Sequence, residues 1–225
     1  MQHSAFSIVN ALPGVLIIRN LESQSYKEIY SKMKEFTADR TSITPDELWF
    51  LEHPAIYTLG QGAKEKHVLD PKNIEVFRCN RGGQVTYHGP GQIIGYLMMD
   101  LKRKSMGIKQ LVAGVEIAIV AVLRSMGISS YAEKKAHGVY VNKKKIAALG
   151  FRVSRGCTYH GFSLNVHMDL EPFTRINPCG YTDLEVTDIF VEGGDTLVER
   201  VHLSLARELK QIFHYPSLVL EGVVI

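Results

Sequence analysis

The chain has 225 residues, of which 45% are hydrophobic and 22% charged, so it has enough apolar material for one large domain with a continuous core. Its net charge of +3 and pI of about 8.7 are too mildly basic to indicate nucleic-acid binding. We therefore expect a single domain over residues 1–225 and no nucleic-acid partner.

The cysteines and the apolar segments of the sequence indicate the cellular compartment of the protein. Cys79, Cys157 and Cys179 are an odd count that suggests no disulfide framework, which favours a reducing compartment. The apolar run at 15–18 is too short for a signal peptide, and the run at 111–123 is too short and amphipathic to span a bilayer. The sequence predicts a cytoplasmic protein without a membrane partner.

The N-terminal half alternates strand and helix patterns. A short apolar strand at 16–19 precedes a helix over 25–39, whose start is marked by a capping box, Ser25-x-x-Glu28. Further strands are predicted around 48–50 and 56–59. A charged loop over 63–72, a strand over 93–101 and a helix over 108–125 follow, and Gly127 stands where a left-handed C-terminal cap belongs.

The C-terminal half carries three closely spaced strand patterns and one helix. The strands are predicted at 138–142, 145–153 and 158–166, and a loop over 177–180 comes next. A second capping box, Thr196-x-x-Glu199, marks the start of the last helix. These elements predict an α/β or α+β fold, in which a β-sheet is flanked by helices.

The most distinctive stretch combines glycines that permit close approach of a ligand with a dense set of polar side chains. An extended segment and a Gly-Pro-Gly turn follow its opening glycine pair. A strand pair with a Gly-rich turn is the plainer alternative, but the length of the stretch favours the floor of a binding site. Its residues are Arg81, Gly82, Gly83, Gln84, Val85, Thr86, Tyr87, His88, Gly89, Pro90, Gly91 and Gln92.

Cys179 is the candidate nucleophile, because it lies between a proline and a glycine in a loop. A free thiol with a pKa near ~8.5 is only slightly ionised at neutral pH, and a nearby ammonium group favours the thiolate. Lys145 could supply that ammonium group and, once deprotonated, act as a general base. The alternatives are an inert core cysteine and, for the run 143–145, a solvated turn. Only the apolar flank Ile146-Ala147-Ala148 indicates that Lys145 points inward.

Two histidines and a possible metal site are further candidates for a functional role. His88 and His160 each follow a tyrosine and precede a glycine, so either could orient a substrate carbonyl or simply end a strand. Cys157-x-x-His160 with His167 offers metal ligands, but no second matched pair announces a zinc site. Phosphate-binding loops of the dinucleotide and Walker types are absent. We expect no metal and no cofactor.

Taken together, the ordered motifs resemble one family, the lipoyl(octanoyl) transferases, also called octanoyl-acyl-carrier-protein–protein octanoyltransferases. The resemblance covers about residues 48–187 and rests on the order and spacing of five motifs. These are Arg81 to Gln92, Lys145-Ile146-Ala147, Thr158-Tyr159-His160-Gly161-Phe162, Leu164-Asn165-Val166 and Asn177-Pro178-Cys179-Gly180.

The resemblance implies a biotin/lipoate protein ligase-like fold, with a mixed sheet flanked by helices. It also implies transfer of an octanoyl group from octanoyl-acyl carrier protein to a specific lysine of a lipoyl domain. The acceptors would be the lipoyl domains of 2-oxo acid dehydrogenase complexes and the glycine cleavage H protein. We expect the enzyme to act as a monomer.

The resemblance further assigns roles to individual positions. Cys179 would carry the acyl group as a thioester, Lys145 would be its partner, and His160 would give possible support. The acyl and carbonyl site would be lined by Arg81, Gly82, Gly83, Gln84, Val85, Thr86, Tyr87, His88, Ala148, Leu149, Gly150, Gly161, Phe162 and Ser163.

Two other activities and two local features stayed open. An ATP-dependent lipoate or biotin ligase would need no nucleophilic cysteine, and a non-catalytic module would only bind acyl carrier protein or fatty acid. Cys157, and more weakly Cys79, could compete with Cys179 near the site. Lys143, Lys144, Arg152 and Arg155 could form a docking patch for acidic carrier proteins or, alternatively, a solvated face.

Overall fold

The structure, a computed structural model, describes residues 14–133, 136–182, 184–220 and 223–224. Its helices are α2 (Tyr26–Asp39), α3 (Ile108–Ser125) and α4 (Val198–Ile212), and its 3-10 turns are η1 (Glu65–His67), η2 (Glu171–Arg175) and η3 (Pro178–Gly180). Its strands are β1 (Leu16–Ser23), β2 (Asp46–Glu52), β3 (Ile56–Leu59), β4 (Glu75–Arg78), β5 (Val85–His88), β6 (Gln92–Met98), β7 (Tyr131–Ala132), β8 (Val139–Val141), β9 (Lys144–Ser154), β10 (Cys157–Asn165), β11 (Leu218–Leu220) and β12 (Val223–Val224).

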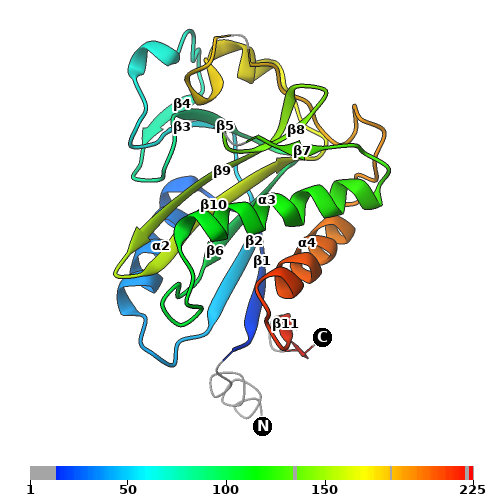
Figure 1. Cartoon of the computed structure of the whole chain (residues 1–225). Helices are drawn as coiled ribbons and strands as arrows, with labels where there is room; N and C mark the ends of the chain where they lie inside the picture. The colour runs from blue at the N-terminus through cyan, green and yellow to red at the C-terminus, as the bar shows by residue number, and fades with distance from the viewer. Residues whose placement is uncertain (1–13, 134–135, 183, 221–222, 225) are drawn as a thin grey trace.

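Nine of the described strands form one mixed sheet in the order β12-β11-β1-β2-β6-β10-β9-β8-β7. β1 runs parallel to β2 and to β11, whereas β2-β6-β10-β9-β8 pair in antiparallel fashion. Helices α3 and α4 lie across one face of this sheet, and α2 lies behind it (Figure 1). The predicted mixed sheet flanked by helices is confirmed.

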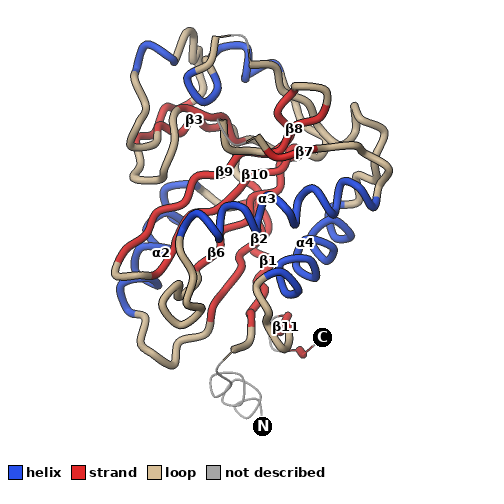
Figure 2. Tube along the Cα trace, viewed as in Figure 1, coloured by secondary structure: helices blue, strands red, loops and turns tan. Residues whose placement is uncertain are grey.

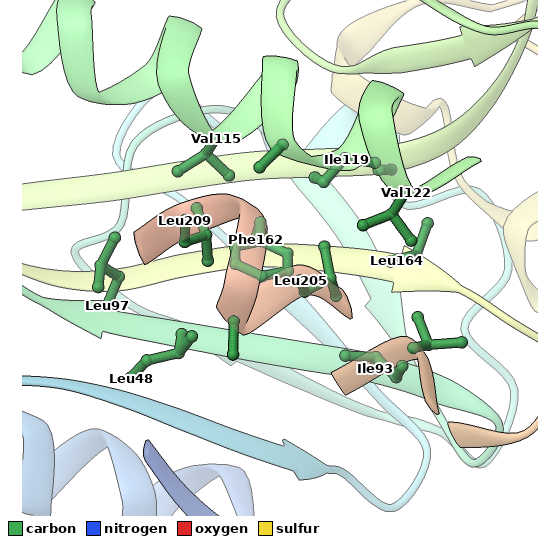
Figure 3. Close-up of a cluster of buried hydrophobic side chains, with 14 of the residues drawn as sticks. Leu48, Ile93, Leu97, Val115, Ile119, Val122, Phe162, Leu164, Leu205 and Leu209 are labelled. Atoms are coloured by element: carbon green, nitrogen blue, oxygen red, sulfur yellow. The ribbon is translucent and has the colours of Figure 1, made fainter. Parts of the chain in front are cut away.

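The larger core fills the space between this sheet and the helix pair α3 and α4 (Figure 3). Alternation along β6 explains how the strand serves two cores, since successive side chains point to opposite faces. Ile93 and Leu97 belong to the α3–α4 core, while Ile94 and Tyr96 point to the opposite face and pack with α2. The first face is therefore closed by helices, and the second is the face on which a site can open.

A second, three-stranded sheet in the order β4-β3-β5 lies beyond the end of the main sheet, at the top of the view in Figures 1 and 2. The loop before β5 joins the two sheets, because the Gly82 amide donates to the Phe151 carbonyl of β9 at 3.0 Å. This join places the Gly-rich stretch over the open face of the main sheet.

Several boundaries agree with the sequence patterns. The helix predicted over 108–125 is α3, and the three strand patterns of the C-terminal half are β8, β9 and β10. Gly127 has a φ of +81°, as a left-handed helix end requires.

Both predicted capping boxes were wrong. Ser25 stands at the N-cap of α2, but its side chain makes no capping hydrogen bond. The last helix begins only at Val198, because Asp195 accepts the Leu197 amide at 2.9 Å and pairs with Arg200 in place of a threonine cap. The carboxylate therefore sets the start of α4.

Two further boundaries differ from the predictions. The strand predicted over 93–101 is β6, which ends at Met98; a turn follows because the Asp100 side chain accepts two amides from the residues after it. The charged loop predicted over 63–72 contains the short turn η1.

Candidate active site

Lys145 and Cys179 are in contact at the N-terminal end of β9. The Lys145 Nζ lies 3.0 Å from the Cys179 Sγ and 3.1 Å from the His137 carbonyl oxygen. Lys145 is only 4% exposed, although two lysines precede it and the turn there is solvated. The apolar flank at 146–148 therefore indicated the inward direction of Lys145 correctly.

The surroundings of Lys145 act on its charge in opposite directions. Burial is the largest influence and lowers its pKa, but the Cys179 sulfur and then Tyr140 outweigh it, so that the pKa of Lys145 is raised. The Tyr140 ring centre lies 5.2 Å from the Nζ. An ammonium group is thus held against the sulfur inside a largely buried site.

The turn that carries Cys179 is a strained one. Cys179 has a φ of +56°, a left-handed conformation that non-glycine residues rarely adopt, and Gly180 follows with a φ of +82°. The Asn177 amide anchors the turn by donating to the His67 carbonyl at 2.8 Å, and the Gly180 amide donates back to the Asn177 carbonyl at 2.9 Å. The predicted loop is therefore a fixed 3-10 turn that presents one sulfur atom.

A pocket opens next to Cys179, between the main sheet and the Gly-rich stretch. Most of the positions that were predicted to line an acyl site line this pocket: Arg81, Gly83, Gln84, Val85, Thr86, His88, Ala148, Leu149, Gly150, Gly161, Phe162 and Ser163. His160, predicted as possible support, also lines it.

Two predicted lining residues, Tyr87 and Gly82, lie outside the pocket wall. Because neighbouring residues of a strand face opposite ways, the Tyr87 ring turns away and packs against Tyr57 and Phe173. Gly82 joins the two sheets through Phe151, and a Cβ there would lie 3.0 Å from the Phe151 carbonyl oxygen. Both residues therefore support the wall from behind.

Three further residues of the pocket, Tyr26, Ile94 and Tyr96, were not predicted from the sequence. Ile94 and Tyr96 could have been found from alternation along β6, since they pair with Ser163 and Gly161 of β10. No local signal marked Tyr26, which reaches the pocket from the first turn of α2.

Arg81 braces the pocket wall from within the protein. Its guanidinium group donates to the Thr58 hydroxyl and carbonyl oxygens and to the carbonyl oxygens of Gly82 and Gln84, at 2.6 to 3.1 Å. The guanidinium group of this pocket residue therefore also holds the loop that forms the wall.

His88 and His160 are buried and neutral. Burial lowers the pKa of each to about 3. His160 has a φ of +61°, and its ring stacks on the neighbouring Tyr159 and on Tyr30 of α2. The left-handed backbone therefore turns the imidazole to the same face of the sheet as Tyr159, beside the pocket.

Neither of the two other thiols belongs to the Lys145–Cys179 dyad. Cys157 pairs with Ser154 at the far end of β10, nine strand positions from the level of Lys145 and so roughly 30 Å along the sheet. Burial raises the pKa of the Cys157 thiol. Cys79 is buried and accepts a hydrogen bond from the Tyr26 hydroxyl at 3.1 Å. The prediction that Cys157 lies near the site was wrong.

The predicted docking patch is not one surface. Lys144 pairs with Glu185 at the start of β9, whereas Arg155 donates to the carbonyls of Thr37 and Ala38 beyond the other end of the strand. An eleven-residue strand separates these two ends by about 30 Å. Lys143, Lys144, Arg152 and Arg155 therefore cannot face one small partner surface together.

Two further features of the described part of the chain concern metal ions and membranes. No group of three or more histidine, cysteine and carboxylate side chains that could hold a metal ion occurs there. Among the described helices, none has the length and apolar character needed to cross a membrane.

Residues 25–210 match the family model of the lipoyl protein ligase A/B catalytic domain. An octanoyltransferase of Colwellia psychrerythraea is 52% identical over 79% of this chain and 76% of its own length. Octanoyltransferases of Alkalilimnicola ehrlichii and Shewanella amazonensis are 49% and 45% identical, over 84% and 91% of this chain and 88% and 94% of their own lengths.

Solved structures share the fold at low sequence identity. A lipoate-protein ligase A bound with ATP superimposes with a TM-score of 0.74 at 18% identity, covering 93% of this chain and 87% of its own. A biotin protein ligase from Aquifex aeolicus gives a TM-score of 0.54 at 14% identity, covering 89% of this chain and 70% of its own. The biotin/lipoate protein ligase-like fold is thereby confirmed.

Proposed function

The chain belongs to the octanoyltransferases of the lipoyl protein ligase A/B family, and we propose that it moves the octanoyl group through a covalent thioester on Cys179 with Lys145 as the proton carrier. One observation supports this mechanism above all others: the 3.0 Å contact between the Lys145 Nζ and the Cys179 Sγ beside the pocket. A nucleophile within hydrogen-bond reach of its base is the arrangement that acyl transfer requires.

In the first half-reaction, the Cys179 thiolate attacks the carbonyl carbon of the donor thioester. The carbon–sulfur bond to the donor breaks, and Lys145 gives its proton to the departing thiolate, which leaves as a neutral thiol. The ammonium group favours the charged sulfur before the attack because the two groups touch in a buried site.

In the second half-reaction, the amine of an acceptor lysine attacks the thioester on Cys179. The amine must lose a proton, and Lys145 accepts it while Cys179 departs as the thiolate. Acylation itself prepares Lys145 for this step. It removes the sulfur charge that raises the pKa of Lys145 and leaves burial, which lowers that pKa, opposed by Tyr140.

The pocket next to Cys179 is the place for the octanoyl chain. The stretch beside the sulfur includes small side chains, among them Ala148, Gly150 and Gly161, so an unbranched chain can lie on the sheet. Tyr26 and His160 line the same pocket as Cys179. An apolar chain placed there would leave water and bring its carbonyl carbon to the sulfur.

We propose octanoyl-acyl carrier protein as the donor. The acceptors would be the lipoyl domains of 2-oxo acid dehydrogenase complexes and the glycine cleavage H protein, and the enzyme would act as a monomer. A covalent intermediate supports this assignment, because it lets two protein substrates use one small site in turn. The cytoplasm suits this chemistry, since all three cysteines are free and the nucleophile must stay reduced.

The test is to incubate the full chain with octanoyl-acyl carrier protein and to map the adduct by peptide mass spectrometry. We expect a hydroxylamine-sensitive octanoyl group on Cys179 that disappears when an apo lipoyl domain is added. Cys157→Ser is the matched control and should acylate like the unchanged protein. An adduct on Cys157, or transfer that survives Cys179→Ala, would contradict the mechanism.

A further inference from the structure

A chain of buried hydrogen bonds runs from the pocket wall to the strand that carries Lys145. Each of its side chains is at most 9% exposed, and they come from four different strands and two loops. In order, its members are Arg81, Thr58, His88, Gln92, Asn165 and the carbonyl oxygen of Thr187.

The donor directions in the first half follow from Arg81, which can only donate. The Thr58 hydroxyl oxygen accepts from Arg81 at 3.0 and 3.1 Å, so its own hydrogen is directed to the His88 Nε2 at 3.2 Å. The His88 Nε2 is then the acceptor, and the protonated Nδ1 donates to the Gln92 Oε1 at 2.8 Å. Burial keeps this imidazole neutral by lowering its pKa to about 3.

The second half continues in the same direction. Since the Gln92 Oε1 accepts from His88, the Gln92 Nε2 faces Asn165 and donates to the Asn165 Oδ1 at 2.9 Å. The Asn165 Nδ2 in turn donates to the Thr187 carbonyl oxygen at 2.9 Å. The orientation of both amides is thus determined by the groups before them.

This series of hydrogen bonds ends where β10 stops pairing with β9. The last pair of these two strands is Leu164 with Ala147, and beyond it residues 185–187 take the place beside β9. The Lys145 amide donates to the Glu185 carbonyl at 2.8 Å, and the Thr187 amide donates to the Lys145 carbonyl at 3.0 Å. Residues 185–187 therefore hold the main chain of Lys145, and Asn165 holds them to β10.

We propose that Gln92 and Asn165 are positioning residues for Lys145. They hold residues 185–187 in place, and residues 185–187 in turn set the position of the Lys145 Nζ relative to the Cys179 Sγ. This inference rests on the proposed function. Such contacts must hold reacting groups to within about 0.5 Å to be productive.

The pair is better suited to this role than an apolar pair would be. Gln92 and Asn165 face each other across β6 and β10 and are 1% and 4% exposed. Burying two amides carries a desolvation penalty that hydrophobic residues would avoid, so their benefit lies in the directed bonds that they make. Those bonds end on a carbonyl oxygen next to Lys145.

The test uses Asn165→Asp and Gln92→Glu, which keep the size of the side chain and replace its donating nitrogen by an oxygen. Asn165→Asp places a carboxylate oxygen next to the Thr187 carbonyl oxygen, and Gln92→Glu places one next to the Asn165 Oδ1. In both variants two acceptors face each other without a hydrogen between them. We expect the rate at which iodoacetamide alkylates Cys179 at pH 7 to fall by about tenfold, because the ammonium group no longer sits against the sulfur. The rate is followed by mass spectrometry of the Cys179 peptide in a Cys157→Ser background.

Thr158→Val is the matched control. It lies in β10 and is fully buried. The valine loses the hydrogen bond that the Thr158 hydroxyl donates to the Leu97 carbonyl and the one that it accepts from the Met99 amide, but it stands at the end of the strand away from the dyad. We expect it to lower the melting temperature as the test variants do and to leave alkylation within about twofold. Where Asn165→Asp does not fold, Gln92→Glu carries the test, since it disturbs Asn165 by removing the hydrogen bond that orients it.

Repeating both substitutions in a Lys145→Met background decides whether they act through Lys145. We expect their effect on alkylation to vanish there, since no ammonium group remains to be misplaced. The proposal would be overturned if the substitutions slowed alkylation equally with Lys145 and with Met at this position. It would also be overturned if they left alkylation unchanged in the protein that keeps Lys145. The assay needs neither donor nor acceptor, so a failure of the proposed octanoyl transfer would leave it informative.

Discussion

In the mechanism that we propose, the chemistry depends on a single amine, Lys145, that has to be charged in one half-reaction and neutral in the other. In the free protein, Cys179 outweighs burial and raises the pKa of Lys145. The thioester carries no charge, so acylation removes the main influence that opposes burial. In the proposed mechanism, this change of charge on the sulfur lets one residue serve as acid and then as base.

Lys145→Arg separates these two roles. A guanidinium group keeps the positive charge near Cys179 but cannot act as a base, because its pKa is above 12. We expect acylation of Cys179 to stay within about tenfold and transfer to the acceptor amine to fall at least about 100-fold. Release of the donor thiol measures the first step, and decay of the isolated acyl-enzyme with an apo lipoyl domain measures the second. Lys145→Met should slow both, and an equal loss in both steps with arginine would contradict the two roles.

At the scale of the elements, the site needs glycine where strands and loops approach most closely. A Cβ on Gly161 would lie 1.9 Å from the Gly95 carbonyl oxygen of the neighbouring strand. The main chain of β6 and β10 would have to separate, and these are the strands that carry Gln92 and Asn165. Gly161 is thus required by the pairing of the strands.

Gly161→Ala is therefore expected to destabilise the fold by about 1–3 kcal/mol or more, because a fixed main-chain atom blocks the new methyl group. Urea unfolding followed by circular dichroism measures the loss. Gly62→Ala is the matched control, since its Cβ would meet its nearest neighbour, the Gly83 carbonyl oxygen, at 3.4 Å, and its stability should change by less than about 0.5 kcal/mol. Equal stability of the two variants would contradict the close approach.

The sequence predicted the elements well where a repeating pattern covered the whole element. Eighteen residues of helical periodicity gave the bounds of α3, whereas capping signals three residues long were wrong at α2 and α4. A cap depends on one side-chain rotamer and on competing carboxylates such as Asp195, which the local pattern does not show.

At the scale of the whole molecule, the site combines residues that no local pattern connects. Tyr26 reaches the pocket from the first helix, and Asn165 reaches the main chain of Lys145 through Thr187. The family motifs predicted which segments would converge. The distance of Cys157 from the dyad and the separation of the basic residues at the two ends of β9 follow only from the strand register.

The convergence of these segments buries three neutral histidines in and near the site, and this has a consequence for stability. Burial lowers the pKa of His53 to about 4 and the pKa of His88 and His160 to about 3. The unfolded chain takes up these protons below pH 6.5, whereas the folded chain does not until the pH reaches about 3 to 4. Their contribution to stability is therefore complete above pH 6.5 and is lost as the pH falls toward the folded pKa values.

His53→Gln tests this dependence with the smallest change to the structure. The His53 Nδ1 lies 2.6 Å from the Gln24 carbonyl oxygen, and its Nε2 lies 2.7 Å from the Tyr96 hydroxyl, partners that an amide can also bond. Between pH 6.5 and 4.5 we expect the free energy of unfolding to fall less steeply for the variant, by up to about 1.4 kcal/mol per pH unit, because one fewer proton is taken up on unfolding. Urea unfolding at several pH values gives both slopes, and parallel slopes for the two proteins would show that His53 is not held neutral.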